Sequence, residues 1–298
     1  MSIFLRDIHF LALLLLGFLL SYLLTRFFIK FMVNYRYSFD LHKRDKEKIP
    51  EMGGIVPVLI ISLLSLPLDF KVALLLFLTG LVGVYDDLFK LSPLKKILLL
   101  GIIGGVVGYL LFGLDVKTFL MVLGVAIFSN FTNMLAGFNG LEIGLGIISA
   151  FFLGLILLLN GEYEGFKLIL LFIVSYLGFL IFNRYPAKVF PGDVGTLPIG
   201  AFLVTLAILY SVPEFLIIMI PYIIDASLKY LSAGVTKRED HKPTRLGEDR
   251  KLHVDGGYLS LPRLILKICP MREDRLVLLL WIIGGCFGIL AILCRLIR

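Results

Sequence analysis

Cysteine is scarce in this chain, with 3 residues among 298, at Cys269, Cys286 and Cys294. Two of them fall within the last apolar segment, and none stands at the spacing of a metal-ligand pair. We therefore interpret all three as packing residues and expect no thiolate metal site. Internal repeats and low-complexity segments are also absent from the sequence, which excludes a repeat architecture.

The N-terminal segment lacks the marks of a cleaved signal peptide. Its apolar run from Ile8 to Phe31 is too long, no strongly basic region precedes it, and no clear small-residue cleavage site follows it. We therefore expect this segment to remain as the first helix.

Apolar residues, by contrast, are abundant. The chain is 59% hydrophobic with a mean hydropathy of +0.96, whereas soluble domains are roughly 45–50% apolar. A membrane-spanning helix needs about 20 mostly apolar residues. Ten segments are candidates, at about 8–31, 54–68, 70–85, 95–113, 117–134, 143–160, 166–182, 196–211, 213–230 and 276–295. The sequence predicts an all-α, polytopic integral membrane protein that forms one domain over residues 1–298, with the second and third helices sharing the short hinge SLPLDF.

Lysine and arginine are distributed unevenly over the loops. The loop at 34–54 and the run at 229–275 are rich in both, whereas the opposite loops carry only Lys71, Lys117 and Lys167. Positively charged loops stay in the cytosol, and this asymmetry accounts for most of the net charge of +7. We expect both termini outside and cytosolic loops at about 34–54, 86–95, 134–142, 183–196 and 231–275.

Unusual polar residues gather at one end of the predicted helices. They follow the first, third, fifth, seventh and ninth helices, in the segments DLHKRDKEKIPEMGG, DDLFK, NFTNMLAGFNGLE, NRYPAKVFPGDVGT and REDHKPTRLGEDRK. Ionisable groups at a membrane edge are candidates for function. One shared site facing the cytosol explains their common side.

The pair Asp86 and Asp87 ends the apolar run VALLLFLTGLVGVY. Two carboxylates about 5 Å apart repel by roughly 3 kcal/mol at an effective dielectric constant near 20, so a positive group is expected beside them. Lys90 could screen the charge of Asp86 from one helical turn away. A Mg²⁺ ion, which prefers carboxylates and phosphate oxygens, would serve equally well.

The asparagines and Asp193 allow two interpretations each. Asn130, Asn133 and Asn139 could cap a helix end, but three amides within ten residues exceed that need, and amide groups can ligate Mg²⁺ or read a nucleobase edge. Asp193 could be a helix N-cap. Its flanking glycines would equally let backbone amides approach a phosphate.

Basic residues concentrate in the segment HKPTRLGEDRK, which contains His241, Lys242 and Arg245. Clusters of this kind bind phosphates through lysine point charges and arginine forks. A solvated loop that contacts lipid headgroups would have the same composition.

Together these segments resemble the polyprenyl-phosphate N-acetylhexosamine-1-phosphate transferases, the glycosyltransferase 4 family. The resemblance covers nearly the whole chain and follows the family's order: KIPEMGG, DDLFKLSPLKK, NMLAGFNGLE, VFPGDVG and LILKICPMREDRLVLLL. It is strongest to the branch that makes N-acetylglucosaminyl-diphosphodolichol. The peptidoglycan branch, which uses a muramoyl pentapeptide, differs because it typically has aspartate where Ala136 stands and three histidines where only His241 is present.

The resemblance implies roles for individual residues. Asp86 and Asp87 match the catalytic pair, and Asn133 and Asp193 match the Mg²⁺ ligands, for which Mn²⁺ could substitute. The substrate-binding set comprises Leu41 and Glu51 in the first cytosolic loop, Lys90, Lys96 near the phosphates, Asn139 at the uracil, and His241, Lys242 and Arg245 at the diphosphate.

The implied reaction moves N-acetylglucosamine-1-phosphate from UDP-GlcNAc to a dolichyl-type polyprenyl phosphate and releases UMP, as the first step of lipid-linked glycan assembly for N-glycosylation. Direct displacement and a two-step route through an aspartyl intermediate both remain open. Within the same family, the donor could instead be a muramoyl-pentapeptide or another UDP-sugar. The alternative of another class is a transporter of an anionic solute or of a lipid carrier. Transporter sites, however, usually lie near the bilayer midplane, where this sequence has mainly leucine, isoleucine, phenylalanine and glycine.

The expected partners follow from this reaction. They are a UDP-N-acetylhexosamine, a polyprenyl phosphate and the lipid bilayer, with no nucleic acid. The apolar helix faces could contact lipid or a second copy in a homodimer. We expect a multi-pass protein of the cell membrane, or of the endoplasmic reticulum membrane in a eukaryote.

Overall fold

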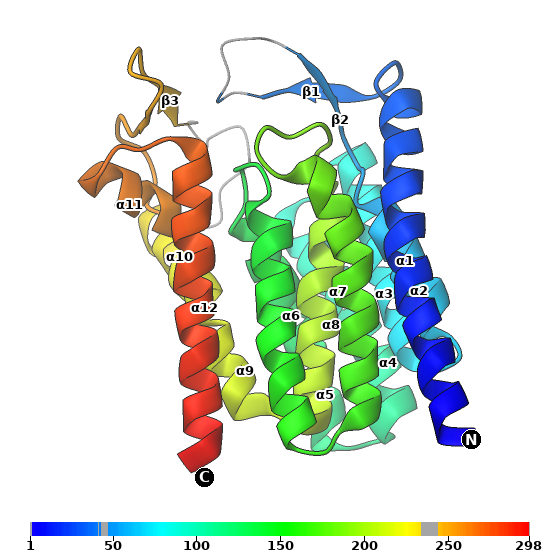
Figure 1. The fold of residues 1–298 in the computed structure, drawn as a ribbon. Helices are drawn as coiled ribbons and strands as arrows, with labels where there is room; N and C mark the ends of the chain where they lie inside the picture. The colour runs from blue at the N-terminus through cyan, green and yellow to red at the C-terminus, as the bar shows by residue number, and fades with distance from the viewer. Residues whose placement is uncertain (1, 41, 43–46, 234–243, 298) are drawn as a thin grey trace.

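The computed structural model describes residues 2–40, 42, 47–233 and 244–297. Of the predicted site residues, Leu41, His241 and Lys242 lie outside this range. The described chain forms a bundle of helices with two small hairpins at one end, and both termini lie at the other end (Figure 1). The expected all-α, polytopic membrane architecture is confirmed.

The helices are α1 (Ser2–Met32), α2 (Ile55–Ser65), α3 (Phe70–Phe89), α4 (Pro93–Phe112), α5 (Val116–Met134), α6 (Leu141–Leu159), α7 (Tyr163–Asn183), α8 (Gly192–Tyr210), α9 (Val212–Ile218), α10 (Ile220–Ala233), α11 (Leu261–Ile268) and α12 (Glu273–Ile297). Eight of them, α1, α3 to α8 and α12, are long and apolar enough to cross a membrane. These eight correspond to eight of the ten predicted segments.

The other two predicted helices differ from expectation, and in both cases proline accounts for the difference. The second, predicted over 54–68, has only 11 residues because α2 ends just before Pro67. The ninth, predicted over 213–230, is broken into α9 and α10, which meet at 62°. Pro221 lies at the second position of α10; it lacks a backbone N–H and would clash with the preceding turn of a continuous helix.

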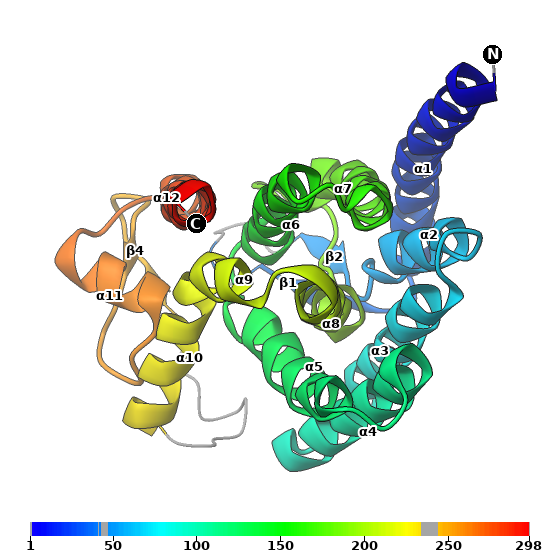
Figure 2. The same cartoon turned by 90° about the horizontal axis from the view of Figure 1, so that it is seen from below.

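Helix α8 forms the centre of the bundle. Figure 2 shows α8 enclosed by α2, α3, α5, α6 and α7. Of the residues in its most apolar stretch, 89% are buried inside the protein. The backbones of α3 and α8 approach closely at Gly83, where an added Cβ would lie 2.4 Å from the Cα of Val194. This contact is one turn before Asp86 and brings the polar end of α3 against the start of α8.

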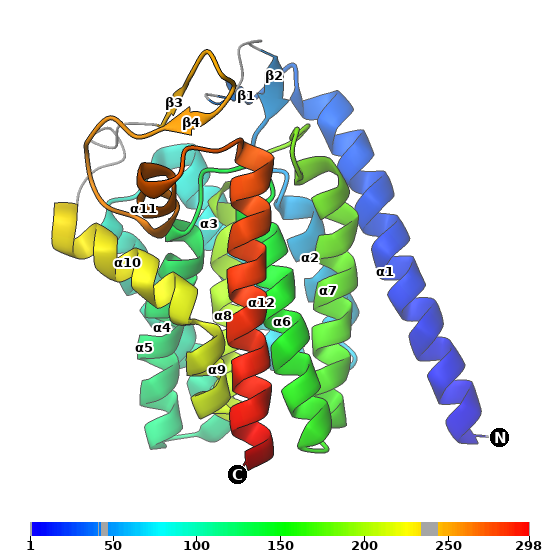
Figure 3. The same cartoon turned by 60° about the vertical axis from the view of Figure 1, so that its left-hand side comes forward.

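The polar end of the bundle carries the short strands. Strands β1 (Tyr37–Phe39) and β2 (Lys48–Pro50) pair antiparallel with Ser38 opposite Ile49, and β3 (Arg245–Leu246) pairs with β4 (Leu252–His253). Figure 3 shows α10 leaning away from the bundle, with α11 beside it. Helix α11 falls within the predicted loop 231–275, where no helix was expected.

Candidate active site

Three buried charged residues from different helices meet at the polar end of the bundle. The Nζ atom of Lys96, on α4, lies 2.6 Å from Oδ2 of Asp86 on α3 and 2.5 Å from Oδ2 of Asp193 on α8. Their exposed fractions are 8%, 5% and 1%. Lys96 is therefore the positive group beside Asp86, and it neutralises a second carboxylate as well.

Asp87 faces a different environment from its neighbour. Its Oδ1 and Oδ2 accept hydrogen bonds from the backbone N–H groups of Asp193 and Val194, at 3.0 and 3.1 Å. These amides belong to the first turn of α8, where no intrahelical acceptor exists and the helix dipole favours negative charge. Asp87 thus caps α8 from another helix, and the doubled charge is divided between a lysine and a helix N-terminus.

The start of α8 requires a glycine at position 192. Gly192 has a φ of +68°, and an added Cβ there would lie 2.5 Å from Oδ2 of Asp87. The N-cap residue of α8 is Pro191, which makes no side-chain cap. Asp193 is therefore not the N-cap, and its carboxylate is directed instead at Lys96 and Asn133.

Asn133, at the end of α5, joins this cluster. Its Nδ2 donates to Oδ2 of Asp193 at 3.0 Å, and its Oδ1 accepts from the hydroxyl of Thr196 at 2.8 Å. Asn130 lies one turn earlier and donates to Ala126 O of its own helix. Of these two amides, Asn133 thus contacts the carboxylate cluster, whereas Asn130 serves its own helix. Thr196 was not predicted as a site residue. Its position one helical turn after Asp193 is the signal that could have placed its side chain beside Asp193.

Backbone hydrogen bonds connect two of the motifs that are distant in sequence. Gly53 N donates to Phe190 O and Gly54 N to Pro191 O, both at 2.9 Å, and Phe190 N donates to Pro50 O at 2.8 Å. The segment KIPEMGG therefore holds Phe190 and Pro191, the part of VFPGDVG that leads into Asp193.

Arg36 fixes the outer side of the cluster. Its guanidinium donates to the backbone carbonyl of Asp87 and forms an ion pair with Glu51 at 3.2 Å. Arg36 thus connects the predicted substrate residue Glu51 to the backbone of Asp87. Arg36 was not predicted.

Two predicted substrate residues are exposed at the surface. Lys90 ends α3 in the left-handed conformation, with its backbone N–H donated to Asp86 O and its side chain exposed. Arg245 forms an exposed ion pair with Asp255 at 2.7 Å. Neither contact joins these two side chains to the cluster around Lys96.

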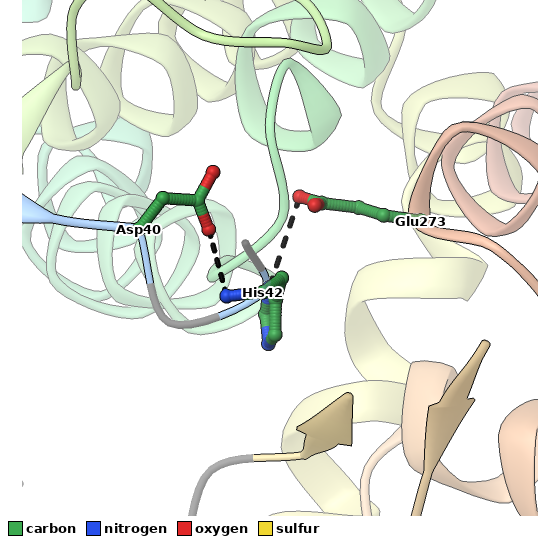
Figure 4. Close-up of side chains that lie close together, drawn as sticks. All are labelled: Asp40, His42 and Glu273. Carbon is green, nitrogen blue, oxygen red and sulfur yellow. Dashed lines mark hydrogen bonds and ion pairs between the residues drawn. The ribbon is translucent and has the colours of Figure 1, made fainter. Parts of the chain in front are cut away.

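Asn139 belongs to a second polar cluster, which Figure 4 draws around Asp40, His42 and Glu273. The Nδ2 of Asn139 donates to Oδ2 of Asp40 at 2.8 Å, and its backbone N–H donates to Oε1 of Glu273 at 2.6 Å. The pKa of the nearby Tyr185 phenol is raised, mainly because the phenol is partly buried and to a smaller extent because Glu273 is negatively charged. Asn139 is therefore held by residues from both ends of the chain.

Lys229 secures the loop between these two clusters. Its Nζ donates to the backbone carbonyl of Met134 and lies 2.8 Å from Oδ2 of the buried Asp225. Asp225 also accepts from Leu261 N at 2.8 Å, which attaches α11 to α10. These residues stabilise the end of α5 next to Asn133; no motif in the sequence indicates them.

Comparison with known proteins identifies a related family. The sequence model of Glycosyl transferase family 4 matches residues 70–211, a range that contains Asp86, Asp87, Lys96, Asn133 and Asp193. A protein of Methanocaldococcus jannaschii, provisionally named a glycosyltransferase, is 54% identical over 289 residues, which cover 95% of each chain.

Two further relatives carry more specific names. A Saccharolobus solfataricus protein, provisionally named a UDP-N-acetylglucosamine–dolichyl-phosphate N-acetylglucosaminephosphotransferase, is 30% identical over 97% of this chain and 98% of its own. A phospho-N-acetylmuramoyl-pentapeptide-transferase of Streptococcus pneumoniae is 33% identical over 61% of this chain and 66% of its own. With one relative 54% identical and the other 30% identical over nearly their full lengths, this membrane protein belongs to glycosyl transferase family 4.

Proposed function

We propose that the protein transfers N-acetylglucosamine-1-phosphate from UDP-GlcNAc to a dolichyl-type polyprenyl phosphate, with release of UMP. The observation that carries this proposal is the bridge of Lys96 between Asp86 and Asp193, with Asp87 on the N-terminus of α8 beside Asn133. Phosphoryl transfer requires mainly positioning and charge neutralisation. This cluster offers a buried cation with two carboxylates bound to it, the amide of Asn133 on one of them, and a third carboxylate on the backbone amides of α8.

The donor set suits a Mg²⁺ ion. Magnesium binds through one or two carboxylates and completes its shell with water and substrate phosphates. Asp193 and Asn133 would hold it, and the amide of Asn133 would turn so that Oδ1 faces Asp193 while Thr196 contacts Nδ2. When bound, Mg²⁺ would neutralise the diphosphate of the donor.

The roles of the protein groups follow from their contacts. Lys96 neutralises carboxylates in the substrate-free chain, and its flexible ammonium would turn toward the diphosphate when the donor binds. That movement would release Oδ2 of Asp86, which could then accept a proton from the lipid phosphate. Both oxygens of Asp87 are held by the amides of α8, so Asp87 would position α8 and Asp193.

Two features favour the dolichyl branch over the muramoyl-pentapeptide branch. The relative named for the dolichyl-type reaction aligns over 97% of this chain, whereas the pentapeptide transferase aligns over 61%. Ala136, in the loop before Asn139, carries no charge where the peptidoglycan branch typically has aspartate. We assign the uracil edge of the donor to Asn139, whose amide is held by Asp40.

A donor screen tests the proposal. Purified protein is incubated with Mg²⁺, a polyprenyl phosphate and each of several radiolabelled UDP-sugars, and the lipid phase is assayed for label. We expect label from UDP-GlcNAc, release of UMP, and no label with the Asp193→Asn variant. Absence of label with every donor, or release of UDP, would contradict the proposed reaction.

A further inference from the structure

The second polar cluster brings together three potential metal ligands. Asp40 and His42 follow strand β1, and Glu273 is the first residue of α12, so the group joins segments more than 230 residues apart. One ligand atom from each lies within 4.8 Å of the other two (Figure 4). Asp40 is 6% and Glu273 4% exposed. Two buried carboxylates therefore lie close to one imidazole, which is a set of groups that bind metal ions.

The distance between His42 and Glu273 fits two ligands of one ion. The Nδ1 of His42 lies 3.8 Å from Oε1 of Glu273, which is longer than a hydrogen bond. Two atoms that each bind one ion at about 2.1 Å are separated by about 3 to 4.2 Å. The longest separation in the group is no more than 4.8 Å, so a shift below about 1 Å would close the three ligands around one ion.

The second oxygen of Glu273 gives an independent indication of a ligand. Its Oε2 is buried and, within the described part of the chain, has no hydrogen-bond partner. Buried carboxylate oxygens without a partner are costly and rare. Coordination of a cation by both carboxylate oxygens would satisfy Oε2, and Oε1, which has a second lone pair, would also keep the hydrogen bond from Asn139 N.

The surroundings of His42 are those of an oriented metal ligand. Its Nε2 lies 2.6 Å from the hydroxyl of Thr244, and its ring stacks on Phe138 with centroids 5.1 Å apart. A ligating histidine usually has its other ring nitrogen hydrogen-bonded, which fixes the ring and its tautomer. Here that bond directs Nδ1 toward Glu273.

We propose that Asp40, His42 and Glu273 bind a divalent transition-metal ion, of which Zn²⁺ is the best match to one imidazole and two carboxylates. The site shares no residue with the cluster around Lys96 and does not depend on the proposed reaction. Asn139 contacts both Asp40 and Glu273, so the ion holds the Asn139 loop, the segment after β1 and the start of α12 together.

Zinc binding by the purified full-length protein tests this site. Metal is removed with EDTA, the chelator is exchanged away, and Zn²⁺ is titrated in excess Mg²⁺, which keeps oxygen-only sites filled. Bound zinc is measured by elemental mass spectrometry, and thermal unfolding is followed in parallel. We expect about one Zn²⁺ per chain and a melting temperature that rises with zinc.

Paired variants separate this site from surface binding. His42→Ala and Glu273→Gln should each weaken zinc affinity at least about tenfold and remove the zinc-dependent rise in melting temperature. His253→Ala, which removes a half-buried histidine paired with Asp249, and Asp274→Asn, next to Glu273, should bind zinc as the wild type does. Asp40→Asn provides a second test if either variant fails to fold.

Two results would overturn the proposal. One is unchanged zinc affinity in folded His42→Ala and Glu273→Gln, which would place the bound zinc elsewhere. The other is a wild-type melting temperature that does not respond to zinc. The Asp193→Asn variant should keep its zinc while losing turnover, so failure of the proposed reaction would leave this result unaffected.

Discussion

Lys96 and Asp193 lie 97 residues apart in sequence and meet at an Nζ–Oδ2 distance of 2.5 Å, and both residues are buried. Asp86 shares the same ammonium group. The pairing connects α3, α4 and α8 at the polar end of the bundle, so a change at Lys96 affects three helices at once.

Replacing Lys96 by methionine should lower both stability and turnover. It leaves Asp86 and Asp193 buried without their cation, and breaking a buried ion pair typically costs about 3–5 kcal/mol. We expect a clearly lower melting temperature and a loss of at least about a hundredfold in turnover, which corresponds to about 2.7 kcal/mol of barrier. Lys95→Met is the matched control, because Lys95 is adjacent and exposed. Equal effects in the two variants would contradict a specific role for Lys96.

Asp87→Asn should separate helix capping from catalysis. The amide retains one acceptor for the N–H groups of Asp193 and Val194, so the loss of stability should be close to that of a helix cap, about 1 kcal/mol. Because the variant alters the position and charge of the cluster around Asp193, we expect turnover to fall at least about a hundredfold. Unfolding in denaturant and turnover are measured together. Near-normal turnover would restrict Asp87 to a capping role.

Turnover should require a divalent cation. Excess EDTA should abolish lipid-linked product, and Mg²⁺ or Mn²⁺ should restore it, because the donor set of Asp193 and Asn133 is made of oxygen ligands. Asn133→Ala should raise the Mg²⁺ concentration needed for half-maximal rate at least about tenfold. Full turnover in EDTA would exclude the proposed magnesium role.

Asn139→Ala should weaken binding of the nucleotide more than it slows the reaction. The side chain is held by Asp40 near the proposed uracil position, and a lost base contact reduces donor affinity. We expect KM for UDP-GlcNAc to rise at least about tenfold with a smaller change in kcat. Asn130→Ala is the control, since that amide bonds to Ala126 O of its own helix. An unchanged KM in Asn139→Ala would remove this residue from the donor site.

The sequence predicted the members of the cluster more successfully than it predicted the contacts between them. Asn133 and Asp193 were expected together and lie 3.0 Å apart, because both stand at helix ends on one side of the bundle. The partner of Asp86 is Lys96 on the next helix, whereas i,i+4 spacing pointed to Lys90. Spacing along one helix is visible in a sequence, but contacts between helices depend on packing.

Other features were beyond sequence reasoning for different physical reasons. The cluster of Asp40, His42 and Glu273 joins segments from opposite ends of the chain, so no local pattern marks it. The break at Pro221, in contrast, had a visible signal, since proline rarely continues a helix in its interior. It was missed because hydropathy alone defined that segment.

Donor choice separates the two branches of the family. Ala136 is half-buried in the loop that leads from Asn133 to Asn139. Its methyl group can form neither an ion pair nor a hydrogen bond with a peptide. We therefore expect kcat/KM for UDP-GlcNAc to exceed that for UDP-MurNAc-pentapeptide at least about tenfold, a difference of about 1.4 kcal/mol in transition-state binding. Both donors are measured with one polyprenyl phosphate, and Ala136→Asp should reduce the ratio. Equal or reversed values in the wild type would assign the chain to the pentapeptide branch and leave its membership of the family intact.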